Sequence, residues 1–187
     1  MTSTRRLSRS ASIGKYGNAA KEMAVNIFAM MQDSESKLVQ FIQRLVNERQ
    51  MFARHVLSTD VDGWTPLHAS VLRGSKKLIK VVLTSGIDIN TPMGEAEGLP
   101  EQCTPLHIAC WRGNEDVIKL LLSHGADING KDGSGKTPVM YAVKRRNHDV
   151  VRLMERKGAD MTSVKFPSNW GKNKSPKTSK LKHLFFS

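Results

Sequence analysis

The chain has 187 residues, 39% of them hydrophobic and 25% charged, which is the composition of an ordinary folded protein with one domain or two small ones. No apolar run approaches the ~18 residues of a membrane-spanning helix, so no membrane partner is expected. Two cysteines, seven positions apart, are too few for a disulfide framework and fit a reducing compartment.

The net charge of +12 is concentrated at the two ends of the chain. Residues 1–21 carry five basic side chains and residues 165–187 carry six, and neither stretch contains an acidic one. The residues between them hold 18 basic and 17 acidic side chains. A nearly neutral body with two basic tails is therefore expected. Such tails act as targeting signals or as arms that bind anionic partners, or they are solvated disordered ends without a specific role.

Residues 1–19 form the first tail, which is rich in serine and arginine. Ser8 follows a pair of arginines in "RRLS" and Ser12 lies three positions after Arg9, so both resemble sites for basophilic kinases. The same composition is typical of mitochondrial presequences, which keeps a mitochondrial location open beside a cytoplasmic or nuclear one.

Two stretches in residues 20–59 have the apolar spacing of amphipathic helices. "AAKEMAVNIFAMMQ" places methionines and Ile27 on one side, and "SKLVQFIQRLVNERQ" places Leu38, Phe41, Ile42 and Leu45 on one side. Phe52 and Val56 predict a partner helix after the second stretch. Core packing is the favoured role of the first helix, and docking on a partner is the alternative.

A motif recurs three times in the next hundred residues: "TPLHASVLRG" from Thr65, "TPLHIACWRG" from Thr104 and "TPVMYAVKRR" from Thr137. Each copy is followed by a second apolar stretch that ends in "GIDIN", "GADIN" or "GADMT". The threonines are expected to cap short helices that start with proline. The glycines before the final motif are expected to end the second helix of each unit in a left-handed conformation.

This pattern resembles the ankyrin repeat family, whose signature is T-P-L-H-x-A with a period near 33 residues. The resemblance implies an all-α solenoid with three repeats at 60–98, 99–131 and 132–163, the first lengthened by an insertion around 91–102. It also implies that residues 20–59 act as a helical or degenerate N-terminal cap. The third unit has Arg146 and Glu155 in place of glycine and leucine, which is typical of a terminal capping unit.

One stretch offers a competing interpretation, because "GKDGSGKT" at 130–137 fits the P-loop pattern G-x-x-x-x-G-K-[ST]. A phosphate-binding loop follows a buried strand, whereas this one follows a predicted helix and its cap. The stretch also occupies the same place as "DVDGWTP" in the first unit. We therefore expect an inter-repeat turn and no cofactor. No residues at plausible spacing suggest a catalytic or metal site, so the protein is expected not to be an enzyme.

In ankyrin proteins the turn tips and the exposed side of the first helix of each unit bind partners. At the equivalent positions of this sequence, the resemblance implies a partner-binding surface. On it, three arginines form a row and two tryptophans are available at the surface to contact the partner. The expected binding residues are Asp62, Trp64, Leu72, Arg73, Trp111, Arg112, Lys136, Lys144 and Arg145. The histidines of T-P-L-H, His68 and His107, are expected to have a structural role.

Residues 164–187 form the lysine-rich second tail, in which Ser175 precedes a proline and resembles a proline-directed phosphorylation site. The sequence as a whole predicts a monomeric, non-catalytic adaptor or regulator that binds an acidic, partly apolar segment of another protein. The alternative is a nuclear regulator whose basic tails contact nucleic acid or chromatin.

Overall fold

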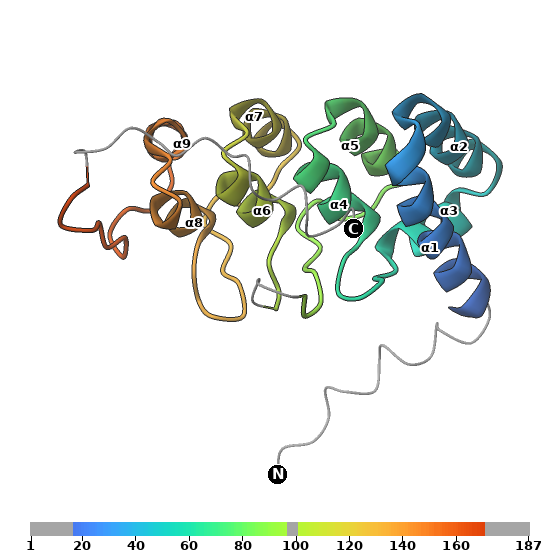
Figure 1. Ribbon diagram of the computed structural model, residues 1–187, viewed down its shortest axis with the longest axis horizontal. Coiled ribbons are helices and arrows are strands. Elements are labelled where there is room, and N and C mark those ends of the chain that lie inside the picture. Colours follow the sequence, from blue (N-terminus) through green and yellow to red (C-terminus); the bar gives the residue numbers. More distant parts are fainter. Residues whose placement is uncertain (1–16, 97–100, 171–187) are drawn as a thin grey trace, which may run out of the picture.

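The computed structural model describes residues 17–96 and 101–170. Within these residues it contains nine helices and no strand, and an isolated bridge joins Val61 and Trp64. The helices lie in two rows (Figure 1), and the loops between units extend beyond the inner row like fingers. The outer row holds α2 (Glu35–Glu48), α5 (Lys76–Leu83), α7 (Glu115–Ser123) and α9 (His148–Arg156). The inner row holds α4 (Pro66–Arg73), α6 (Pro105–Arg112) and α8 (Pro138–Lys144). This is the all-α solenoid that the sequence predicts.

The ends of the helices follow the local signals in the sequence. All three inner helices begin with the proline after a threonine in extended conformation, where a missing backbone N–H costs nothing. Gly74 and Gly113 end α4 and α6 in the left-handed region, with φ of +79° and +77°. The expected left-handed glycines after the outer helices are also present, with φ between +79° and +91°.

Three helices close the N-terminal end of the stack: α1 (Gly17–Asp33), α2 and α3 (Gln50–Ser58). Helix α2 continues the outer row against α5, while α1 and α3 both contact α4. Ile27 and Met31 of α1 are buried in the core, so the preferred interpretation of this helix as a packing element is confirmed. The cap therefore uses one more helix than a repeat does.

The three fingers bind one another through their backbones. Finger 1 spans 59–65, finger 2 includes the described residues 90–96 and 101–104, and finger 3 spans 129–137. The N–H of Gly94 donates to the carbonyl of Gly63 at 2.9 Å, and the N–H of Gly133 donates to the carbonyl of Glu101 at 2.8 Å. Asn90 accepts from the N–H of Asp127, and Asn129 from that of Asp160, each at 2.8 Å. These bonds fix each unit relative to the next.

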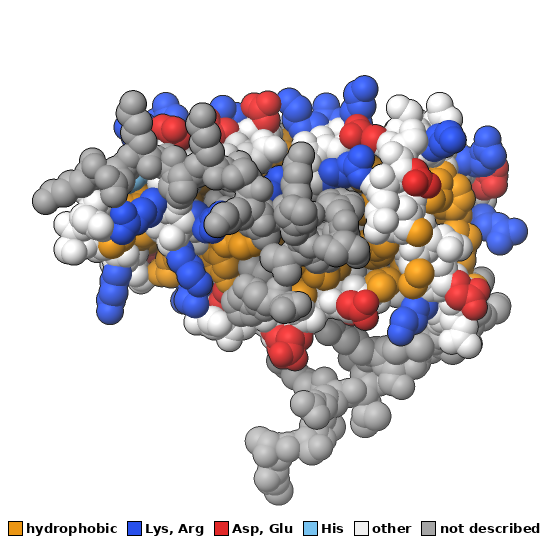
Figure 2. Space-filling view, viewed as in Figure 1, with side chains coloured by type: hydrophobic (Ala, Val, Ile, Leu, Met, Phe, Trp, Pro, Cys, Tyr) orange, Lys and Arg blue, Asp and Glu red, His pale blue; other side chains and the backbone are white. Residues whose placement is uncertain are grey.

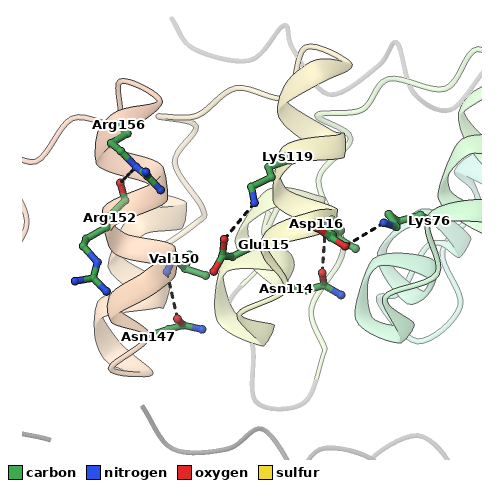
Figure 3. A network of polar contacts seen from close by, with 10 residues as sticks. Lys76, Asn114, Glu115, Asp116, Lys119, Asn147, Val150, Arg152 and Arg156 are labelled. Atoms are coloured by element: carbon green, nitrogen blue, oxygen red, sulfur yellow. Dashed lines mark hydrogen bonds and ion pairs between the residues drawn. The ribbon is translucent and has the colours of Figure 1, made fainter. Parts of the chain in front are cut away.

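Polar contacts also order the starts of the outer helices (Figure 3). Asn114 caps α7 by accepting from the N–H of Val117 at 3.1 Å, and Asn147 caps α9 by accepting from that of Val150 at 3.2 Å. Lys76 of α5 forms an ion pair with Asp116 of α7 at 3.0 Å. Both partners of this pair are exposed, so its contribution to stability is small.

The C-terminal end of the stack differs from a repeat junction. Arg146 stands where the other units have glycine and adopts a left-handed φ of +55°. Its guanidinium donates to the side-chain oxygen of Asn169 at 2.9 Å. The ring of Trp170 lies 4.1 Å from that of His148 and 5.0 Å from that of Phe166. Residues up to Trp170 thus pack against the last unit, in a stretch that the sequence analysis assigns to the tail.

Gly113 provides a test of unit-to-unit packing. A Cβ at this position would lie 2.0 Å from Nδ2 of Asn147. The Oδ1 atom of the same asparagine caps α9. Gly125→Ala is the matched control, because Gly125 is also left-handed and a Cβ there meets nothing within 4 Å. The control should lose about 1–2 kcal/mol from the left-handed alanine alone. Gly113→Ala should lose about 1 kcal/mol more, because the cap must move.

Urea denaturation of the two variants measures this difference. Equal losses in both would show that Asn147 moves aside without cost and that the close contact does not limit this position.

Candidate functional site

Two buried histidines connect neighbouring units. His68 lies with Nδ1 2.7 Å from the hydroxyl of Thr65 and Nε2 3.0 Å from the carbonyl oxygen of Cys103. His107 repeats this arrangement with Thr104 at 2.8 Å and the carbonyl oxygen of Lys136 at 2.9 Å. Because a carbonyl only accepts, each Nε2 donates and each Nδ1 accepts, which requires a neutral ring. The expected structural role of both histidines is confirmed by these contacts.

Burial keeps both rings neutral. It lowers the pKa of His68 from 6.5 to about 4, and it also lowers the pKa of His107. Both nitrogens of each ring are engaged, so neither ring is free to act as a base or a ligand. Within residues 17–96 and 101–170 no group of three or more metal-ligating side chains comes together.

The third unit replaces this bridge with a different one. Met140 stands where the histidine would be, and the buried hydroxyl of Thr137 has no hydrogen-bond partner among the described residues. Instead, the hydroxyl of Tyr141 donates to Asp132 and lies 3.3 Å from the sulfur of Cys103. Burial alone would raise the pKa of Asp132, but hydrogen bonds from Tyr141 and two backbone N–H groups together lower it. Sequence reasoning missed this network, although the polar pair of Asp132 and Tyr141 beside a missing histidine is a usable signal.

The candidate binding surface lies at the C-terminal ends of the inner helices. Arg73 and Arg112 end α4 and α6, and Arg145 caps α8, so stacking of the three helices places them in a row. The guanidinium of Arg145 lies 5.3 Å from the ring centre of Trp111, which is half-buried like its neighbour Arg112. Arg73 and Lys144 are exposed, and Leu72 is half-buried. We call Arg73, Arg112 and Arg145 the arginine row.

The comparisons with known proteins agree with this geometry. The family model for ankyrin repeats (3 copies) matches residues 93–165, and the model for a single ankyrin repeat matches residues 62–93. The chain belongs to the ankyrin repeat family. Ankyrin repeats are protein–protein interaction modules and are typically non-catalytic. A search of curated proteins returns no match for this chain.

One expected contact of the ankyrin surface needs correction. The side chain of Trp64 is only 5% exposed and belongs to the hydrophobic core, so the expectation that it is available at the surface is wrong. The backbones of Val61 and Trp64 bind each other at 2.8 and 3.0 Å and close a tight turn. This turn leaves Asp62 exposed at the tip with a left-handed φ of +51°. Lys136 is exposed on finger 3, as expected.

The loop that fits the P-loop pattern is the third ankyrin finger. Oδ1 of Asp132 accepts hydrogen bonds from the backbone N–H groups of Ser134 and Lys136 at 2.8 and 2.9 Å. Those are the kind of amides with which a P-loop holds phosphate. Here they bind the chain's own carboxylate, and the loop follows α7 and its turn rather than a strand. The expected inter-repeat turn is therefore what the structure shows.

The candidate phosphorylation sites Ser8, Ser12 and Ser175 lie outside the described residues, as does most of each basic tail. Their roles stay predictions. Among the described helices none is both long enough and apolar enough to cross a bilayer.

Thr65→Val and Thr137→Val form a matched pair that tests the histidine bridge. Thr65→Val should cost about 1–3 kcal/mol, because it leaves Nδ1 of buried His68 without its donor. Thr137→Val should be neutral or stabilise by up to about 1 kcal/mol, because the hydroxyl that it removes is buried without a partner. Urea denaturation measures both. A loss in Thr137→Val as large as that in Thr65→Val would contradict this account.

The buried histidines also predict how stability depends on pH. The pKa of His68 is lower in the folded chain than its ordinary value of 6.5, so the unfolded chain binds more protons between pH 6.5 and about 4. Stability should be complete above pH 6.5 and fall by about 3 kcal/mol toward pH 4 on account of His68 alone. His107 adds to the loss in the same direction. The contribution of Asp132, whose pKa is lowered from 3.8, is lost only at lower pH.

Urea denaturation at pH 7, 5.5 and 4 measures this dependence. His68→Gln should be less stable at pH 7 but lose less stability on acidification than the wild type. His124→Gln, at an exposed ring, is the control for the removal of one histidine from the chain. An unchanged slope in His68→Gln would assign the pH dependence to other groups.

Proposed function

We propose that this protein is a non-catalytic adaptor or regulator that binds an acidic, partly apolar segment of a partner protein across its inner helices and fingers. The arginine row with Trp111 is the observation that carries this proposal. Tryptophan and arginine are the residues most enriched among energetically dominant interface contacts. An arginine fork grips a carboxylate with two parallel hydrogen bonds.

The distribution of charge over this surface supports an acidic segment with a defined position. Exposed acidic side chains lie on fingers 1 and 2, at Asp60, Asp62, Glu95 and Glu101. Basic side chains lie at the helix ends, and Figure 2 shows several of them at the end of the stack where α8 lies, next to hydrophobic side chains. An acidic segment is attracted to the helix ends and repelled from those fingertips.

Proximity labelling in cells tests the proposal without knowledge of the partner. The test variant is Arg112→Ala/Arg145→Ala, with Trp111→Ala as a separate variant for the apolar contact. Lys80→Ala/Arg156→Ala is the matched control, because it removes the same charge from exposed positions on the outer row. A form without residues 1–16 and 171–187 completes the set. Thermal unfolding of each form checks that it is folded.

The test variants should lose a set of partner proteins that the wild type, the matched control and the tail-free form all retain. Once a partner is identified, Arg112→Ala/Arg145→Ala should weaken its binding at least about tenfold. If the test variants keep every partner and the tail-free form loses them, recognition resides in the basic tails and the proposal is wrong.

A further inference from the structure

Arg112 and Arg145 are less exposed than Arg73, the third member of the arginine row. They stand at the ends of α6 and α8, which pack directly against each other. The guanidinium of Arg145 is placed over the face of Trp111, the residue next to Arg112. Both arginines are half-buried, whereas Arg73 at the equivalent position of α4 is exposed. The structure thus positions the guanidinium of Arg145 against Trp111 and places half-buried Arg112 at the neighbouring helix end.

Neither group has an anion to balance it within the described chain. No hydrogen bond or ion pair involves the side chain of Arg112 or Arg145 in residues 17–96 and 101–170. Three carboxylates of the last two units are engaged elsewhere: Asp116 with Lys76, Asp149 with Arg152 and Asp132 with Tyr141. A helix dipole favours a cation at the C-terminal end of the helix, which is where each of these arginines stands. Neither guanidinium, however, donates a hydrogen bond to the final carbonyl groups of its helix.

The two charges also destabilise each other. Partial burial lowers the pKa of Arg112, and the neighbouring charge of Arg145 lowers it further. An anion bound between them would relieve both effects. One carboxylate carries a single charge and is matched by a single arginine fork. A phosphate monoester carries about two charges at pH 7 and offers three strong acceptor oxygens, so it can satisfy two guanidinium groups together.

We propose that Arg112 and Arg145, with exposed Lys144 beside them, bind a phosphate monoester on a serine or threonine of the partner segment. This inference rests on the proposed function and names the chemistry of its acidic group. Trp111 is a positioning residue in this account, because it holds the guanidinium of Arg145 in place. The partner would then bind after its phosphorylation and dissociate after its dephosphorylation.

A titration of the full chain with two small probes of similar shape tests the site directly. Phenyl phosphate and benzoate are added separately at constant ionic strength, and the indole signal of Trp111 and the side-chain signals of Arg112 and Arg145 are followed by NMR. Phenyl phosphate should shift these signals with an affinity at least about tenfold higher than that of benzoate. Its affinity should fall between pH 7 and pH 5.5, because the second pKa of a phosphate monoester is about 6. The affinity of benzoate should not change over this range.

Arg112→Lys/Arg145→Lys separates the arginine forks from charge alone. It keeps both charges but removes the planar donor pairs, and it should weaken phenyl phosphate at least about fivefold. Lys80→Ala/Arg156→Ala, the control on the outer row, should bind as the wild type does. Equal affinity for the two probes, or an unchanged affinity in the lysine variant, would overturn the phosphate assignment.

The source of the phosphate is tested with peptides that carry phosphoserine, aspartate or serine at one central position, and with a single-stranded oligonucleotide. The phosphoserine peptides should bind best and should shift the Trp111 signal. If the oligonucleotide shifts that signal more strongly, the ligand is a nucleic acid and the proposal is wrong. Phosphatase treatment of partners captured in cells distinguishes the two proposals. Partners that depend on the arginine row but survive dephosphorylation would support the proposed function and contradict the phosphate site.

Discussion

The bridge from threonine through histidine to the next finger is the interaction on which the rest of the stack depends. Each unit alone is a pair of short helices with an apolar side, and only stacking buries that side. His68 and His107 determine how the next unit is placed, because each ring binds its own helix start on one side and a carbonyl of the following unit on the other. The two rings must remain neutral for this. Buried imidazoles therefore link the register of the repeats to pH.

Most of the fold is predictable from the sequence because each signal acts locally. Threonine, proline and left-handed glycine determine where the inner helices begin and end, and the apolar spacing predicts which helix faces are buried. What the sequence does not show is how side chains from different units meet. Tyr141 binds Asp132 of its own unit and approaches Cys103 of the unit before it, and the T-P-L-H-x-A motif specifies neither of these contacts. The packing of Trp170 on His148 is a contact of the same kind.

The same distinction applies to the candidate site, where the repeat pattern predicts the positions of residues along the stack but not the contacts of their side chains. Repeat register correctly places the arginines at the ends of successive inner helices, because equivalent positions in a solenoid form rows. Register does not tell which side of a finger a side chain occupies. The tight turn that starts at Val61 determines where the side chain of Trp64 lies. It leaves Asp62 at the tip of the finger and the indole in the core. Trp111, on a helix rather than a finger, keeps part of its ring accessible and holds Arg145.

The residue at the end of each inner helix lies close to the asparagine that caps the outer helix of the following unit. Gly74 and Gly113 leave room for the asparagine that caps the next outer helix, which would come within 2.8 and 2.0 Å of any added Cβ. Arg146 already has such a Cβ, and Trp170 lies against the same end. A fourth unit of this design, packed at that end, would have to move its capping asparagine away from the Cβ of Arg146. A unit inserted behind Gly74 or Gly113 would keep this asparagine contact unchanged and would add a new position to the arginine row from within.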